Sequence, residues 1–100
     1  MPSYDEMAMR VGQPCRLERC DGNAAGSPYP AILHSISARR VHSGYEQFSL
    51  LFHSRQDQPE QQAIHAATFD DGISWEVFLV PVARVAEGYA YEACFNRALG

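Results

Sequence analysis

Short segments in which apolar and polar residues alternate recur along this chain, and turn-forming residues separate them. The segments are residues 15–20, 29–41, 48–53, 63–69, 75–82 and 89–96. A period of two residues places successive side chains on opposite faces of an extended strand. No long helical pattern lies between the segments. The sequence therefore predicts a mainly β protein, with about six antiparallel strands in a small barrel or sandwich.

The first residues follow a different pattern, in which apolar residues recur at helical spacing over residues 3–11. Ser3 is a suitable N-cap, and Glu6 stands three residues later, which is the spacing of a capping box. Gly12 provides a natural stop. We therefore expect one short N-terminal helix over residues 3–11, followed by a β core over residues 13–96. A chain of 100 residues has the size of one domain, so residues 1–100 are interpreted as a single domain.

Two of the strand segments carry more detailed expectations. Residues 29–41 are interpreted as one strand, with Ile32, Ile36 and Ala38 on the same face. Residues 77–82 are all apolar, so this strand is expected to be central and covered on both faces. Pro81 lacks a backbone N–H, so the strand pairing should loosen there.

The charge pattern excludes some function classes. The net charge is −4, and the largest basic cluster is the pair Arg39-Arg40, so no nucleic-acid partner is predicted. The N-terminus lacks a signal-peptide pattern, and the longest apolar run, residues 77–83, is too short for a spanning helix. Three cysteines are an odd number, which indicates reduced thiols rather than a disulfide scaffold. We therefore expect a cytoplasmic protein without a membrane partner.

The reactive side chains do not form a recognisable catalytic motif. Cys94 or Cys15 near a histidine is the one arrangement that would suggest a thiol-dependent site. His53 and His65 flank one loop and could face each other across paired strands, but they lack a third metal ligand. The alternative is that the thiols fill the core and the histidines lie on strand surfaces. No catalytic residue, metal or cofactor is predicted.

Two further groups have both a structural and a functional interpretation. Asp70, Asp71 and Gly72 could form an acidic metal loop, but their residue types are those of a hairpin turn. The aromatic residues Trp75, Tyr89 and Tyr91 could form an interface with a partner, and the alternative is that they pack in the core.

Three motifs resemble those of a known family. Phe-Ser-Leu-Leu-Phe at residues 48–52, Phe-Leu-Val-Pro-Val at residues 78–82 and Tyr-Glu-Ala-Cys-Phe-Asn at residues 91–96 are similar to motifs of bacterial domain-of-unknown-function family 6916. Gly12-Gln13 and Gln61-Gln62 also match. The resemblance covers nearly the whole chain and implies a bacterial β protein associated with phage-tail-like gene neighbourhoods. It supplies no catalytic residues.

The chain departs from the family pattern at two places. Ser54-Arg55 stands where a glycine-proline pair usually follows the Phe-Ser-Leu-Leu-Phe motif, and Ala63-Ile64 replaces a glycine-tyrosine pair. The turn between these strands is therefore expected to differ from that of other members.

The leading functional hypothesis is a non-enzymatic binding or assembly module, in a phage-tail-like particle or with another protein partner, including a second copy. The alternative is a small-ligand-binding protein or a thiol-dependent enzyme with its site in a barrel mouth.

Overall fold

One short helix and seven strands make up the part of the chain that the computed structural model describes, residues 2–20, 28–55, 62–86 and 88–99. The elements are α1 (Tyr4–Ala8), β1 (Pro14–Arg19), β2 (Tyr29–Ile36), β3 (Arg40–His42), β4 (Tyr45–Ser54), β5 (Ala63–Phe69), β6 (Ser74–Val85) and β7 (Gly88–Ala98). The prediction of a mainly β protein with one short N-terminal helix is confirmed.

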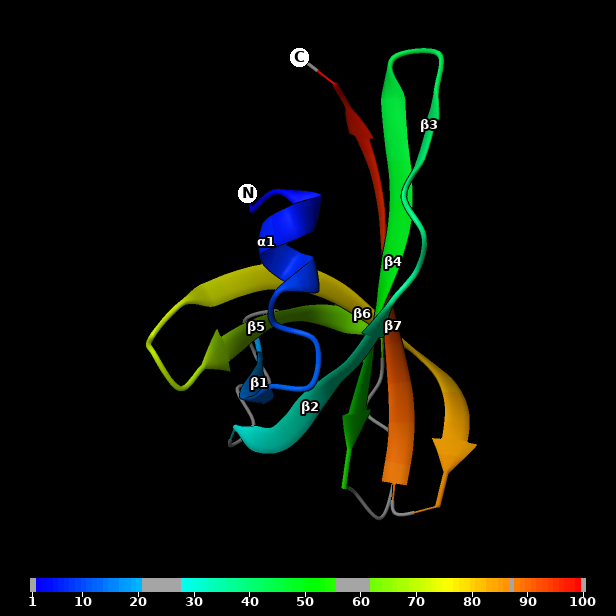
Figure 1. Cartoon of the computed structure of the whole chain (residues 1–100). Helices are drawn as coiled ribbons and strands as arrows, with labels where there is room; N and C mark the ends of the chain where they lie inside the picture. The colour runs from blue at the N-terminus through cyan, green and yellow to red at the C-terminus, as the bar shows by residue number, and fades with distance from the viewer. Residues whose placement is uncertain (1, 21–27, 56–61, 87, 100) are drawn as a thin grey trace.

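Six of the strands close into an antiparallel barrel, which decides between the two predicted architectures. The strand order is β2-β1-β5-β6-β7-β4-β3, and an additional pairing between β2 and β4 closes the ring. The extra strand, β3, pairs with the beginning of β4 outside the ring. Figure 1 shows the barrel, with α1 above it and the β3–β4 hairpin rising away from it.

Alternate side chains of the barrel strands fill its interior. Leu17, Leu33, Leu50, Phe52 and Leu79 are completely buried, and they come from four different strands. Barrels of this size have room for packed side chains rather than for an open channel. The predicted alternation is therefore the pattern that builds the core.

The N-terminal helix packs on the barrel. The Ser3 hydroxyl accepts a hydrogen bond from the Glu6 N–H (3.1 Å), which confirms the predicted cap. Met7 is fully buried, and the Tyr4 ring meets the edge of Phe48 at a centroid distance of 5.0 Å. The helix is shorter than expected, because it ends at Ala8 and turns lead on to Gly12, which has φ 90°.

The expectation of one strand over residues 29–41 is wrong. A register shift between Leu33 and Ser35 makes a β-bulge, and β2 ends at Ile36. Before the bulge Leu33 points inward and Ile32 is 47% exposed, so the predicted shared face of Ile32 and Ile36 does not form. A bulge adds one residue on one strand and reverses the alternation after it, which simple parity counting cannot detect.

The expectation that residues 77–82 are covered on both faces is also wrong. Val77 and Leu79 are buried, but Phe78 and Val82 are 51% and 48% exposed on the outer surface. The predicted loosening at Pro81 is confirmed, because the pairing with β7 shifts register between Pro81 and Ala83.

The turn predicted at residues 70–72 is confirmed. The Phe69 N–H donates to the Ile73 carbonyl (2.8 Å), and Gly72 has φ 89°, a conformation that favours glycine. Asp71 accepts from the Ile73 N–H (3.2 Å) and also pairs with Arg10 at 2.7 Å. These contacts make Asp71 a turn residue that also holds the segment after α1.

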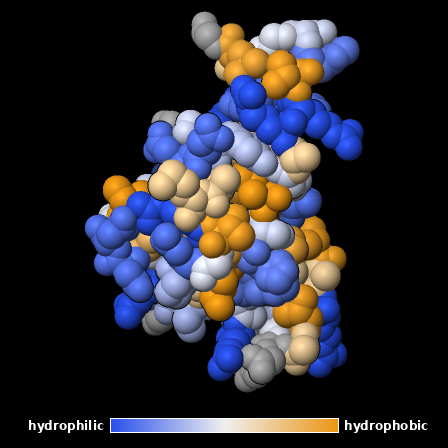
Figure 2. All heavy atoms as spheres, in the orientation of Figure 1, coloured by the Kyte–Doolittle hydropathy of each residue, from blue (hydrophilic) through white to orange (hydrophobic). Residues whose placement is uncertain are grey.

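A three-stranded extension, which we call the arm, projects beyond the closed barrel. It consists of β3, the first residues of β4 and the last residues of β7, and its registers pair Arg40 with Gln47 and Gln47 with Asn96. Figure 1 shows it rising above the barrel, and Figure 2 shows apolar atoms near its end. The arm carries the most prominent functional features of the structure.

Candidate functional site

A break in strand pairing at the base of the arm creates the candidate site. The Ser37 N–H donates to the Ser49 carbonyl (2.9 Å), but the Ser49 N–H donates to the Ser37 side-chain hydroxyl (2.8 Å). The hydroxyl thus takes the place of a backbone carbonyl, and residues 37–39 run outside regular strand structure. The chain leaves β4 here and rejoins it at Arg40.

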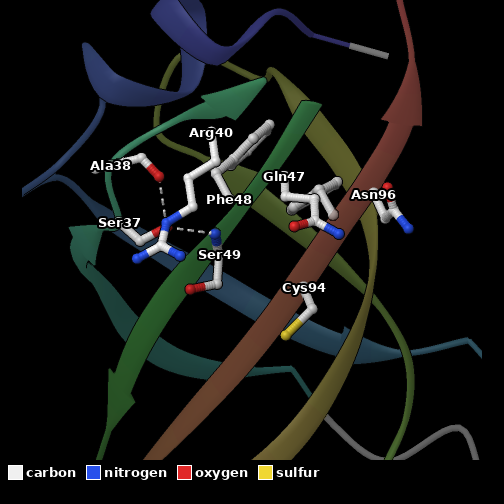
Figure 3. Close-up of a pocket in the computed structure, with 9 residues that line it drawn as sticks. Ser37, Ala38, Arg40, Gln47, Phe48, Ser49, Cys94 and Asn96 are labelled. Carbon is white, nitrogen blue, oxygen red and sulfur yellow. Dashed lines mark hydrogen bonds between the residues drawn. The ribbon is translucent and has the colours of Figure 1, made fainter. Parts of the chain in front are cut away.

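This break opens a pocket of about 480 Å³, which we call the arm pocket. Its lining residues are Ser37, Ala38, Arg40, Gln47, Phe48, Ser49, Cys94, Phe95 and Asn96. Ser49 lies opposite Cys94, and Gln47 lies opposite Asn96, so the floor consists of two cross-strand pairs of polar side chains. Figure 3 shows these pairs on β4 and β7, with the Arg40 side chain beside Ser37 and Ser49.

The arm pocket has the chemistry of a site for a polar or anionic group. The amides of Gln47 and Asn96 can each donate and accept hydrogen bonds. Among the described residues, Arg40 has no hydrogen-bond or ion-pair partner, and its side chain is exposed. A guanidinium group presents a planar fork of donors that matches a carboxylate.

The base of the arm is held by a carboxylate between two arginines. Glu46 is 8% exposed, and its oxygens accept hydrogen bonds from Arg39 (2.7 Å) and Arg97 (3.1 Å). The hydrogen bond from Arg39 is the main cause that lowers the pKa of Glu46. Arg97 also lies over the rings of Phe48 and Phe95. These contacts fix the direction in which the arm leaves the barrel.

A second pocket, which we call the apolar pocket, lies near the other end of the barrel. It has a volume of about 620 Å³. Its lining residues are Pro14, Pro30, Ala31, Ile32, His53, Ser54, Arg55, Val85 and Ala86. Its composition suits an apolar group more than a charged one.

Comparison with known families identifies one match. The family described as Domain of unknown function (DUF6916) matches residues 2–95. The chain belongs to this family. The resemblance inferred from the three sequence motifs is thereby confirmed. No curated protein and no solved structure shows significant similarity to this DUF6916 chain.

The structure does not bring the predicted thiol and imidazole residues together in one site. Cys15 is buried, and burial raises its pKa to about 11. Cys94 is exposed, and its pKa is raised by partial burial and by its hydrogen bond to the Glu92 carboxylate (3.3 Å). A raised pKa leaves less of the nucleophilic thiolate at neutral pH. Neither thiol has the environment that activates a catalytic cysteine.

The two predicted histidines lie on opposite faces of the barrel wall. His65 is completely buried, and its Nδ1–H donates to the Ala63 carbonyl (3.0 Å). His53 lies on the outer face, where its ring stacks on His34 at a centroid distance of 3.9 Å and an angle of 8°. His53 and His65 therefore do not face each other as the sequence suggested. Lone pairs of two parallel stacked rings do not converge, so His34 and His53 are also badly oriented to share a metal.

The predicted interface residues divide between core and surface. Trp75 is 4% exposed and Tyr91 is 1% exposed, so both follow the alternative interpretation, packing in the core. Trp75 contacts Phe69 with ring centroids 4.8 Å apart. Tyr89 is half-buried at the beginning of β7.

The described part of the chain contains neither a cluster of metal ligands nor a membrane-spanning helix. No group of three or more histidine, cysteine, aspartate or glutamate side chains is placed to hold a metal ion in this part of the chain. No described helix is long and apolar enough to cross a membrane.

Sequence reasoning missed the arm pocket as a site. It noted Arg39-Arg40 as a basic pair and Cys94 as a thiol, but nothing in the alternation indicated that the strand breaks after Ile36. The break depends on one side-chain hydroxyl replacing a backbone acceptor, and serines elsewhere in the chain give the same local signal.

Proposed function

We propose that this chain is a non-enzymatic binding module that joins a larger protein assembly through its arm. The observation that carries the proposal is the projection of the arm beyond the closed barrel, with β3 at the end of the strand order. Closure removes free strand edges from a barrel, so a retained extension with an edge is a suitable place for a partner. The family resemblance adds the hypothesis that the assembly is a phage-tail-like particle.

Exposed apolar side chains on the arm support this proposal. Val41 and Tyr45 are 54% and 51% exposed, and Leu99, which follows β7, is 40% exposed. The Leu99 N–H donates to the Gly44 carbonyl (2.8 Å), so this residue lies beside the β3–β4 turn. Exposed apolar side chains on a projecting element are typical of protein contacts. We also propose that the protein acts in the cytoplasm. The three free cysteines support this location, because the cytoplasm keeps thiols reduced.

Light scattering after size-exclusion chromatography tests the proposal, with the protein alone and mixed with the products of neighbouring genes. We expect a complex with at least one of them, or a concentration-dependent oligomer. The double variant Val41→Ser/Tyr45→Ser should reduce its formation. The control is Ile64→Ser/Phe78→Ser, which removes two exposed apolar side chains that face each other across β5 and β6. A strict monomer that binds none of these products would contradict the proposal, and so would equal effects of the two double variants.

The apolar pocket favours a second candidate function, the binding of a small apolar ligand. Ile32 lines this pocket and is 47% exposed, so an Ile32→Glu variant should weaken binding without removing a core contact. Ligand-observed NMR with a library of small aromatic fragments is a direct test. Fragments that bind the variant as well as the wild type would contradict this candidate.

A further inference from the structure

The free side of β3 is an incomplete strand pairing that another chain can extend. β3 pairs with β4 on one side, and no strand of the described residues pairs with its other side. All three of its residues are exposed. Backbone N–H and C=O groups on such an edge can form hydrogen bonds with an added strand, a common mode of peptide recognition.

The charges next to this edge determine which kind of strand can pair with β3. Arg39 is paired with Glu46, but Arg40 has no partner among the described residues. Together with Arg39, which stands just before β3, the arm contains three arginines and one glutamate, a formal charge of +2, whereas the whole chain carries −4. The positive charge is therefore concentrated on the arm, next to the free edge.

A second copy of the chain does not fit this edge. If β3 of one copy added to β3 of another, the positively charged Arg40 side chains of the two copies would be brought close together on the paired strands. Like charges on neighbouring positions of paired strands are destabilising, and such charges are a common protection against pairing between identical chains. The same charge attracts a strand that carries carboxylates.

We propose that the edge of β3 binds an extended acidic segment of another protein, with one carboxylate held by Arg40 at the arm pocket. This inference rests on the proposed function and names the chemistry of the partner. Side chains of an added strand alternate between two faces, so those on the face of Arg40 and Gln47 point toward the pocket. The pocket has a volume of about 480 Å³, which leaves room for a carboxylate-bearing side chain. The Gln47 amide, which lies opposite Arg40 on β4, can donate an additional hydrogen bond.

Selection from a yeast-displayed library of random twelve-residue segments tests the inference on the full chain. We expect the enriched segments to be rich in aspartate and glutamate, and to alternate charged with β-branched residues. A synthetic peptide from the enriched set should shift the backbone amide resonances of Arg40–His42 and bind more weakly as salt increases. Enrichment of neutral or basic segments, or no enrichment above background, would overturn the inference. The arginines would then act only as protection against strand pairing.

A matched pair of charge reversals checks the role of Arg40. Arg40→Glu should weaken binding of the enriched peptide by about tenfold or more, which is the loss expected from one charge-assisted hydrogen bond. Arg84→Glu is the control, because it changes the net charge of the chain by the same amount. Arg84 is exposed on β6 and lies opposite Tyr89, far from the arm along the sheet. Arg40→Gln provides a milder variant if the reversal disturbs folding. Equal losses in the Arg40 and Arg84 variants would contradict a specific contact.

The effect of Arg40→Glu on complex formation also separates this inference from the proposed function. A partner that forms a complex through Val41 and Tyr45 but is insensitive to Arg40→Glu would overturn the acidic-strand inference and leave the binding module intact. A strict monomer that binds no neighbouring product would contradict both.

Discussion

Glu46 and Arg97 lie directly opposite each other on β4 and β7, with Arg97 Nη2 2.9 Å from Glu46 Oε2. The same carboxylate accepts a hydrogen bond from Arg39, which stands just before β3. Arg97 also donates to the Pro2 carbonyl (2.8 Å). One carboxylate thus connects the approach to β3, the end of β7 and, through Arg97, the N-terminal segment.

Replacing Glu46 with glutamine should loosen the arm. The substitution keeps the shape of the side chain but leaves Arg39 and Arg97 close together without their shared anion, and breaking such a network destabilises the groups that remain. We expect faster amide hydrogen exchange in β3 and in residues 96–98, with little change in β5. Glu76→Gln is the control, since Glu76 is exposed on β6. Unchanged exchange in the arm of the Glu46 variant would contradict the structural role of the network.

Acid should destabilise the protein through Glu46 and Asp71. Hydrogen bonds from Arg39 and Arg10, respectively, lower the pKa values of these carboxyls from their usual values of 4.5 and 3.8. Between the lowered and the usual pKa, the unfolded chain binds more protons than the folded chain, so the free energy of unfolding falls as the pH falls. The stabilisation is fully present above about pH 4.5, and it is lost as the pH falls through the lowered pKa values of the folded protein. Urea unfolding at a series of pH values measures this, and Glu46→Gln should flatten the decline.

The sequence predicted the strands and their inward-facing residues well where burial decides the structure, but it left barrel and sandwich open. Leu17, Leu50 and Phe52 alternate with polar neighbours, and each points inward because only one face of its strand meets the core. The prediction of burial was wrong at Phe78, which is as apolar as its buried neighbours but lies on the outer surface of the barrel. A run of apolar residues shows that burial is possible on both faces, but whether a second layer covers the outer face depends on the rest of the fold.

The candidate site was less predictable than the fold. The N-cap at Ser3 has a local sequence signature, but the hydroxyl of Ser37 accepts its hydrogen bond from Ser49, twelve residues later. The polar floor of the arm pocket also depends on the register that pairs Gln47 with Asn96. These are long-range relationships, and local propensity carries no information about them.

The contact between Asp71 and Arg10 gives a prediction for the segment after α1. In Asp71→Asn the side-chain oxygen can still accept from the Ile73 N–H, so the turn should persist while the ion pair with Arg10 is lost. We expect increased exchange of the amides near Arg10 and unchanged exchange across the turn. Asp70→Asn is a suitable control because Asp70 occupies the same exposed turn. Equal responses to the two substitutions would show that the ion pair does not hold this segment.

Two phenylalanines on the barrel should differ strongly in their contribution to stability. Phe52 is completely buried, so Phe52→Ala should cost about 3–5 kcal/mol through lost contacts and a cavity. Phe78 is 51% exposed, so Phe78→Ala should cost well under half of that, about 1 kcal/mol or less. Urea unfolding measures both values, and Phe52→Leu provides a milder core variant if the alanine variant does not fold. Similar costs for the two alanine variants would indicate that the outer face is covered after all.

The three cysteines should react with alkylating reagents at different rates, and this bears directly on the thiol-dependent alternative. Cys20 is exposed and should be modified first, whereas Cys15 is buried and should react only when the protein unfolds. The pKa of Cys94 is raised by partial burial of the thiol and by the Glu92 carboxylate, which opposes formation of the thiolate. Glu92→Gln should therefore lower the pKa of Cys94 toward its usual value and increase its rate of modification at neutral pH, while Glu76→Gln should leave that rate unchanged. Mass spectrometry of iodoacetamide-treated protein at several pH values measures each site separately. Rapid modification of Cys94 at neutral pH in the wild type would contradict the raised pKa and would make Cys94, in the arm pocket, a candidate nucleophile again.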